Sequence, residues 1–363
     1  MNKRSGSLRL ISGVGAKGPA CFVLDADGKR LMLDLGEGPP PGRIPDVDAL
    51  GPIDALVLSH GHRDHVGGLS LLAKLGNPPI FATEIVARGL PKGTVVRPLP
   101  VRGSGDVLGI AVETGRNGHA PGGIWLRFAV GDGFLYTGDF STESILYAYD
   151  PPATSAATAL IDCSYASYET PIAACWDSLR PFVERRPLLL PIPANGRGPE
   201  IALALARHGV SDIFVDDAMQ AALRRLSDSE VVSLQAGLVG EIKRLAQMVK
   251  PIAGAQGVVL AASADGSSGA AAQLLSRWEH DDKITIVFTG YVPPDTPAER
   301  LIKTGRAQFV RWNVHPLLSA TIALTQGVRA KTVIPAFCDR SQLDSLAAAL
   351  RSVRVTMEKK IDI

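Results

Sequence analysis

The sequence has almost no excess charge of either sign. Its 38 lysine and arginine residues nearly balance 36 aspartate and glutamate residues, which leaves a formal net charge of +2. Domains that bind nucleic acid through their overall charge carry a much stronger basic excess. The balance therefore counts against that class of binder, although a local basic patch can still attract a polyanion.

Paired cysteines and long apolar runs are missing as well. The four cysteines are spread over the chain without paired spacing, which predicts reduced thiols and a cytoplasmic protein. No apolar run is long enough to span a bilayer, so we expect no membrane partner. Hydrophobic residues still make up 46% of the 363 residues. This content is enough for a large core, in two domains or in one layered unit.

Histidine is scarce, yet it is concentrated in one place. Three of the seven histidines fall within six positions, as His60, His62 and His65, with Asp64 among them. The apolar run Asp54–Leu58 predicts a buried strand that ends just before them. An extended segment points His60 and His62 the same way, and the other two follow where the chain turns. Imidazole nitrogen with carboxylate oxygen is a ligand set for zinc, manganese and iron, so the cluster predicts a metal site.

This cluster resembles the His-x-His-x-Asp-His signature of the metallo-β-lactamase superfamily. Two later segments follow in the family's order: residues 118–122, G-H-A-P-G, resemble its third motif, and residues 136–140, Y-T-G-D-F, its fourth. The third motif supplies one histidine, and the aspartate of the fourth bridges two metals. The resemblance implies one or two zinc ions, with manganese or iron as alternatives. The implied ligands are His60, His62, Asp64, His65, His119 and Asp139.

Further segments resemble the β-CASP branch of this superfamily, which processes nucleic acids. Residues 162–165, D-C-S-Y, resemble the branch's E-S-T-Y motif, and residues 193–200, P-A-N-G-R-G-P-E, resemble F-A-x-G-R-x-x-E. Residues 288–291, F-T-G-Y, match the start of another motif, and His315 takes the place of the histidine in S-x-H-A-D. Together these segments extend the resemblance over nearly the whole chain.

One segment departs from the branch pattern. The branch has a late strand that ends V-H-G-E, whose histidine binds the second metal. Residues 331–339, K-T-V-I-P-A-F-C-D, fill that place, and Phe337 stands where the histidine belongs. Phenylalanine cannot bind a metal. Cysteine and aspartate can both bind metals, so Cys338 and Asp339 are possible substitutes. For Cys338, a role as a small buried residue is favoured over a role as a ligand. The sequence therefore does not identify a complete set of ligands for the second metal, whereas His60, His62 and His119 form a complete first set.

Hydrophobic periodicity divides the chain into two styles. Residues 8–165 form short strands between glycine-rich turns, among them a strand at Val107–Glu113 and a helix near Leu69–Leu75. Residues 170–300 alternate helices with strands, which predicts a parallel α/β sheet. The resemblance implies an α/β fold, an αββα four-layer sandwich with an inserted, shortened cap. We expect residues 1–168 to begin the sandwich, 169–300 to form the cap and 301–363 to complete the sandwich.

The resemblance implies a metal-dependent phosphodiesterase that cleaves its substrate through a metal-activated hydroxide. RNA is the expected substrate and DNA is the alternative. Asp64 would orient the nucleophile or take its proton. His315 would protonate the leaving group or bind phosphate, and Asp162 would orient His315. Because Pro316 departs from the branch pattern, a structural role for His315 is the alternative. Arg197 follows Gly196 at a strand-to-helix turn and is the best candidate for a phosphate contact.

Two other functions fit the same residues. A hydrolase of a smaller ester, thioester or phosphodiester agrees with the near-neutral charge, but the cap motifs oppose it. A non-catalytic subunit that binds nucleic acid or a partner agrees with Phe337, but the intact earlier motifs oppose it. The sequence also leaves a homodimer open.

Overall fold

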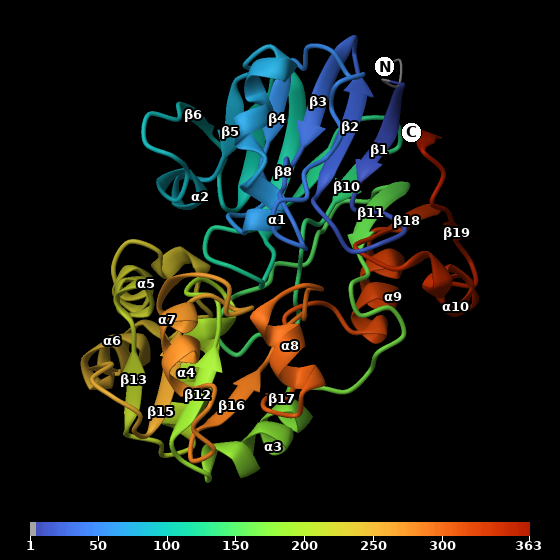
Figure 1. The fold of residues 1–363 in the computed structure, drawn as a ribbon. Coiled ribbons are helices and arrows are strands. Elements are labelled where there is room, and N and C mark those ends of the chain that lie inside the picture. Colours follow the sequence, from blue (N-terminus) through green and yellow to red (C-terminus); the bar gives the residue numbers. More distant parts are fainter. Residues whose placement is uncertain (1–4) are drawn as a thin grey trace. The chain divides into compact units, whose positions relative to one another are not determined.

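The computed structural model describes residues 5–363 and divides them into two compact units, whose elements are labelled in Figure 1. The first unit contains the chain up to Thr142, then Tyr149–Glu169 and His315–Ile363. The second contains Glu143–Ala148 and Thr170–Val314, so it is inserted into the chain of the first. Residues 1–4 of the segment expected at 1–168 lie outside the described residues. The second unit runs to Val314, past the boundary expected at residue 300.

Two mixed sheets of seven strands each form the first unit. In spatial order, the first sheet contains β20 (Lys360–Asp362), β1 (Gly6–Ser12), β2 (Cys21–Ala26), β3 (Lys29–Leu33), β4 (Ala55–Val57), β5 (Ile80–Ala82) and β6 (Val96–Pro98). The second sheet contains β19 (Arg354–Val355), β18 (Thr332–Ala336), β11 (Thr158–Asp162), β10 (Phe134–Tyr136), β9 (Ile124–Phe128), β8 (Ile110–Arg116) and β7 (Gly103–Val107).

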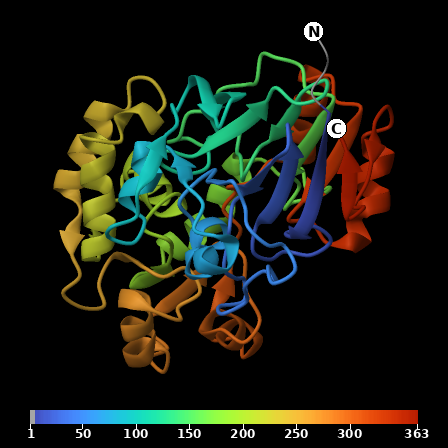
Figure 2. The ribbon, with the colours of Figure 1, turned by 90° about the horizontal axis from the view of Figure 1, so that it is seen from above.

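The two sheets pack face to face and helices cover their outer faces. Phe22 of the first sheet and Phe128 of the second belong to one buried cluster. The 3₁₀ helix η1 (Leu69–Leu75) and helix α2 (Glu84–Arg88) pack on the outer face of the first sheet. Helices α9 (Leu318–Gly327) and α10 (Leu343–Ala349) pack on the outer face of the second. Figure 2 shows these two helices at the red end of the colour bar, outside the strands β18 and β19. The predicted αββα sandwich is confirmed.

One expected strand is in fact a hairpin. The segment Val107–Glu113 contains the end of β7, a turn at Leu108 and Gly109, and the start of β8. Both turn residues have positive φ, 54° and 89°. Two consecutive residues of this kind make the tight turn whose twist matches antiparallel strands. The prediction of one continuous strand was wrong because leucine seldom adopts positive φ, so the apolar run hid the turn.

The second unit is built on one parallel sheet, as the alternation of helices and strands predicted. Its strands, in spatial order, are β14 (Lys250–Pro251), β13 (Ile213–Val215), β15 (Val258–Ala261), β12 (Leu188–Pro191), β16 (Thr285–Phe288) and β17 (Gln308–Phe309). One face is covered by α3 (Ile172–Val183), α4 (Arg197–Arg207), α5 (Asp217–Ser227) and α6 (Val239–Met248), and the 3₁₀ turn η2 (Val231–Ser233) lies between α5 and α6 in the chain. The other face is covered by α7 (Gly269–Trp278) and α8 (Pro297–Lys303). Among residues 5–363, no helix combines the length and apolar character that crossing a bilayer requires.

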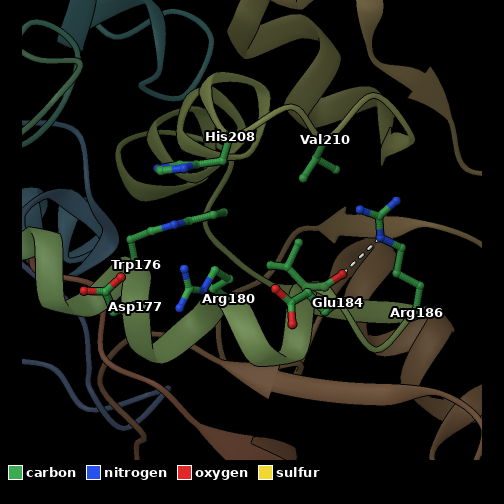
Figure 3. Close-up of a pocket in the computed structure, with 8 residues that line it drawn as sticks. Trp176, Asp177, Arg180, Glu184, Arg186, His208 and Val210 are labelled. Atoms are coloured by element: carbon green, nitrogen blue, oxygen red, sulfur yellow. Dashed lines mark hydrogen bonds between the residues drawn. The ribbon is translucent and has the colours of Figure 1, made fainter.

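A pocket of about 280 Å³ lies beside α3 in the second unit (Figure 3). The indole of Trp176 and the imidazole of His208 stack in its wall, with ring centroids 3.9 Å apart and planes at 10°. His208 is the residue at which α4 ends. This histidine therefore packs against an aromatic ring, and it belongs to no group of potential metal ligands among the described residues.

The buried carboxylate of Glu200 joins three stretches of the second unit. It accepts hydrogen bonds from Ser144 Oγ and the Ile145 N–H, both at 2.7 Å, and from Trp312 Nε1 at 3.2 Å. Burial raises its pKa to about 7, although these hydrogen bonds and the nearby charge of Arg197 act in the opposite direction. Because Trp312 is held in this way, the second unit extends to the end of this stretch at Val314.

Replacing Glu200 with glutamine should change how stability depends on pH. The folded pKa lies above the ordinary 4.5, so the contribution of this carboxyl group is complete below about pH 4.5 and is lost as the pH rises through about 7. Between these limits, the wild type should lose up to roughly 3 kcal/mol of unfolding free energy relative to the Glu200→Gln variant. Urea denaturation of both proteins at pH 5 and pH 8 measures this difference. Equal differences at the two pH values would contradict it.

Candidate metal centre

Four histidines and one aspartate of the first unit meet at the ends of its strands. His60 and His62 follow β4, and His65 lies on the short helix α1 (Arg63–Val66). His119 comes from the loop between β8 and β9, and Asp139 follows β10. The sequence cluster and the two later motifs are therefore brought together, as the resemblance implied.

Backbone hydrogen bonds fix α1 against the loop that follows β3. The N–H of Leu35 donates to the carbonyl of His65 at 2.9 Å, and the N–H of Gly68 donates to the carbonyl of Leu35 at 2.8 Å. Gly36 makes this contact close, since a Cβ atom there would lie 1.8 Å from the carbonyl oxygen of Asp64. Only glycine leaves room for such an approach of two backbones.

Asn117 ties the loop of His119 to the loop of Asp139. Its Oδ1 accepts a hydrogen bond from the N–H of His119 at 3.0 Å. Its backbone carbonyl accepts one from the N–H of Ser141 at 2.9 Å, two residues after Asp139. Its own N–H donates to the carbonyl of Gly123 at 3.1 Å and closes the loop around His119. The sequence reasoning did not single out this asparagine.

Three imidazole nitrogens converge on one point. His62 Nδ1 lies 3.2 Å from His60 Nε2 and 3.0 Å from His119 Nε2. Asp139 stands beside them, with its Oδ2 at 3.5 Å from His119 Nε2 and 3.9 Å from His60 Nε2. Its Oδ1 lies 3.3 Å from His65 Nε2.

The ligand-capable side chains fall into three groups among the described residues. They are His60 with His62 and His119; His60 with His65 and Asp139; and His119 with Asp139 and His315. Asp64, which the resemblance made a ligand and a catalytic residue, is half-buried and belongs to none of these groups. Its proposed roles therefore have less geometric support than those of the four histidines.

The tautomer of His60 fits a bound cation. The Oγ of Ser59 donates its hydrogen to Asp34, so we assign to His60 the tautomer in which Nδ1–H donates to that Oγ at 3.1 Å. Nε2 of His60 then carries a lone pair that faces the cluster. A transition ion would occupy this nitrogen, and the nitrogen-oxygen donor set suits zinc, manganese or iron. The buried Nε2 of His65 faces Asp139 Oδ1 at 3.3 Å.

Asp34 anchors this centre from below, and the sequence reasoning missed it. Its buried carboxylate accepts hydrogen bonds from the Ser59 N–H at 2.7 Å, Ser59 Oγ at 2.6 Å, His65 Nδ1 at 2.7 Å and Tyr136 Oη at 2.5 Å. A bond to Nδ1 turns the Nε2 of His65 toward Asp139. The one signal in the sequence was an acidic residue directly after the apolar strand β3.

Burial and neighbouring charges separate the pKa values of these groups. Burial lowers the pKa of His60 well below its ordinary value, and His65 and His62 lower it further. Burial also lowers the pKa of His65, but Asp139 and Asp34 outweigh it and raise the net pKa well above the ordinary value. For Asp139, burial raises the pKa, whereas His65 and His315 bring it well below the usual range. The centre thus pairs a neutral imidazole with a carboxylate that stays ionised, both forms that bind metals.

His315 and Asp162 form a second pair beside Asp139. His315 Nδ1 lies 2.8 Å from Asp162 Oδ2 and 3.7 Å from Asp139 Oδ2. Asp162 is fully buried, and its Oδ1 accepts hydrogen bonds from the N–H and Oγ of Ser164 at 2.9 and 2.6 Å. The ring of Tyr165 meets the His315 ring edge to face, with centroids 5.2 Å apart. The geometry therefore gives Asp162 the means to orient His315.

Phe337 is buried beside His65. The two rings meet edge to face with centroids 5.2 Å apart, and the N–H of Phe337 donates to the carbonyl of Gly13 at 2.7 Å. Cys338 packs in the apolar cluster under α9 and α10. Asp339 is exposed and caps the 3₁₀ turn η3 (Arg340–Gln342) through the N–H of Ser341. Neither residue belongs to a ligand group of the described structure, so neither replaces the histidine that the family places here.

Arg197, the expected phosphate contact, begins α4 in the second unit and is 8% exposed. Its guanidinium fills the space above Gly290, where a Cβ atom would lie 2.1 Å from Nη1. Its charge also acts on Glu200. These contacts give Arg197 a packing role, and a phosphate contact stays a proposal.

Comparisons with known proteins agree with this geometry. A profile of the metallo-beta-lactamase superfamily matches residues 14–179. Transcription termination factor FttA of Cenarchaeum symbiosum is 27% identical over 56% of this chain and 39% of its own length. FttA of Methanosarcina mazei is 23% identical over 81% of this chain and 57% of its own length. Endoribonuclease YSH1 of Yarrowia lipolytica is 22% identical over 78% of this chain and 42% of its own length.

The chain thus spans 39% to 57% of the length of these curated relatives. A crystal structure of a protein of unknown function from Enterococcus faecalis V583 superposes with a TM-score of 0.64. It covers 99% of both chains at 13% identity. At that identity the likeness shows a shared fold and carries no statement about activity.

Replacing Asp34 with asparagine should weaken metal binding without removing any direct ligand. An amide in place of the carboxylate no longer matches the donors that meet there, so His65 and Ser59 lose their fixed orientation. Substitutions of such supporting groups lower metal affinity by roughly 10- to 100-fold. Competition with a chromophoric chelator measures the zinc affinity. Asp25→Asn, which weakens the ion pairs of this β2 residue with Arg9 and Arg30 away from the centre, is the control. Equal zinc affinities of the two variants would contradict the role given to Asp34.

Proposed function

This chain belongs to the β-CASP branch of the metallo-β-lactamase superfamily, and we propose that it is a metal-dependent hydrolase that cleaves phosphodiester bonds of RNA. The observation that carries the proposal is the convergence of three imidazole nitrogens beside the carboxylate of Asp139: Nε2 of His60 and Nε2 of His119 both lie within 3.2 Å of His62 Nδ1. Such a set is costly to bury unless a cation compensates it. The names of the relatives, a termination factor and an endoribonuclease, support RNA as the substrate.

When bound, a transition ion at this set would supply Lewis acidity and bring the pKa of water toward neutrality. His60, His62 and His119 would hold it through Nε2, Nδ1 and Nε2. Asp139 would face the reacting water and orient it through a carboxylate oxygen. Asp64, by resemblance, would take the proton of that water, for which it must turn toward the centre.

The Asp162–His315 pair gives the departing oxygen a proton source. A hydrogen bond from Nδ1 to Asp162 fixes the ring and leaves Nε2 of His315 available for the substrate. His315 Nδ1 lies 3.7 Å from Asp139 Oδ2, so one phosphodiester bound at the centre would be within reach of both groups, with the attacking water and the departing oxygen on opposite sides of the phosphorus. Cleavage of an RNA strand needs this protonation because an alkoxide is a poor leaving group.

A smaller ester, thioester or phosphodiester remains the second candidate substrate. The observation that favours it is the formal net charge of +2, since the chain has no large overall basic excess to attract a long polyanion. Incubating the protein and zinc or manganese with labelled single-stranded RNA, and separately with small chromogenic bis-esters, separates the two. Cleavage of the bis-esters with intact RNA would favour the small substrate.

Replacing His62 with alanine should abolish zinc binding and RNA cleavage together. His62 Nδ1 is the atom that the other two nitrogens share, so its loss leaves two ligands. We expect cleavage to fall by on the order of 10³-fold or more. The rate on a labelled RNA and the bound zinc measure both effects. His208→Ala removes a histidine of the second unit that stacks on Trp176 and should keep both. RNA cleavage that survives in His62→Ala would assign the activity to another protein.

Replacing Asp162 with asparagine should slow cleavage while metal content stays unchanged. The amide is a weaker acceptor for His315 Nδ1 and no longer fixes the ring, so the leaving group loses a positioned proton donor, at a cost on the order of 10²-fold in kcat. Ser164→Ala removes one hydrogen bond to the other oxygen of Asp162 and should cost less than about tenfold. Steady-state rates and zinc content of both variants provide the measurement. Equal cleavage rates of Asp162→Asn and Ser164→Ala would mean that His315 has a structural role.

A further inference from the structure

We infer that this chain binds one metal ion tightly, at His60, His62 and His119, and that the residues which the structure describes provide no complete set of ligands for a second. The inference rests on the proposed metal chemistry and specifies how many ions the centre takes. It follows from how the three ligand groups share their atoms and from what surrounds His65.

The three groups of potential ligands are not independent of each other. His60 and His119 each belong to two of them. Nδ1 of His60 is hydrogen-bonded to Ser59, so only Nε2 is left to bind an ion. Once a first ion takes His60 and His119 with His62, each remaining group is reduced to two members. These are His65 with Asp139, and His315 with Asp139.

The pair of His315 and Asp139 offers little to a second ion. Nδ1 of His315 is the nitrogen that lies 3.7 Å from Asp139, and the same nitrogen is 2.8 Å from Asp162 Oδ2. We assign to His315 the tautomer in which Nδ1–H donates to that buried carboxylate. A metal bound there would have to displace this proton. The buried carboxylate of Asp162 would then lose its hydrogen-bond donor, which is unfavourable in free energy.

Once the first ion has taken His60, the pair of His65 and Asp139 has no third ligand among residues 5–363. Phe337 lies beside the His65 ring, and its own ring has no donor atom. Phe337 is 4% exposed and packs edge to face with Phe22 as well, at 6.2 Å between centroids, so the two sheets hold its ring in place. Cys338 is buried among apolar side chains under α9 and α10, and Asp339 caps η3.

Zinc sites that persist in proteins have three or four protein ligands, the catalytic ones three. His65 and Asp139 supply two, and Asp139 already stands beside the first set. A second ion would therefore bind weakly and be lost on dialysis. The imidazole of His65 would instead pair with Asp139, whose Oδ1 is 3.3 Å from its Nε2, and would hold that carboxylate in position.

The test is a count of bound zinc on the full chain. Wild-type protein is saturated with zinc and dialysed against metal-free buffer, and zinc and protein are then quantified. We expect about one ion per chain, and about two in Phe337→His, where an imidazole can join His65 and Asp139. Phe337→Leu is the matched control, since it changes the same side chain to one that cannot bind metal, and should keep about one. Circular dichroism of each variant verifies its fold.

The possible counts separate this inference from the proposed function. Two tightly held ions in the wild type would overturn the inference and leave the metal-dependent hydrolase standing. No bound ion in the wild type would overturn both. A rise in Phe337→Leu equal to that in Phe337→His would show that relief of packing, and not a new ligand, admits the second ion, which also overturns the inference. The wild-type count decides the question even if the histidine variant does not fold.

Discussion

The buried carboxylate of Asp34 is the interaction on which the metal centre depends. It lies at the end of β3 in one sheet and accepts the phenol hydrogen of Tyr136 from β10 in the other. Burial and the charge of Asp34 raise the pKa of Tyr136 well above its usual value, so the phenol keeps its proton and remains a donor. Through the same oxygens Asp34 fixes Ser59 and His65. One side chain thus joins the two sheets and sets the direction of two histidines.

Above this anchor, the topology of the second sheet places the remaining groups. β10, β11 and β18 are adjacent and parallel. Asp139 follows β10, Asp162 ends β11 and Phe337 follows β18, so all three lie at the same edge of the sheet. A substitution at the end of any of these strands therefore changes the chemistry of the centre. Phe337 is such a change: its ring joins the buried cluster between the sheets, and a potential ligand is lost without a gap in the packing.

The parts of the site that local sequence could reveal are those with dense chemistry or strong periodicity. His60, His62 and His65 were found because imidazoles at this density have few other uses, and the layers followed from the alternation of apolar residues. Asp34 was missed because a single acid after a strand looks like any polar turn. The second unit ends at Val314 and not at the expected residue 300, and the contact between Trp312 and Glu200, which joins residues 112 positions apart, accounts for the difference. The turn at Leu108 was missed because its backbone conformation is unusual for that residue. Each of these depends on partners that are remote in sequence or on backbone angles.

The asparagine that links the two ligand loops has a consequence for motion. Asn117 accepts hydrogen bonds from the N–H of His119 with its side chain and from the N–H of Ser141 with its backbone carbonyl. A displacement of the His119 loop therefore also displaces the loop that contains Asp139. The positions of the His119 imidazole and the Asp139 carboxylate are thereby coupled through Asn117. Thermal fluctuations that would open the coordination sphere must displace both at once. The centre is in this way preorganised by its backbone, before any cation arrives to draw the ligands together.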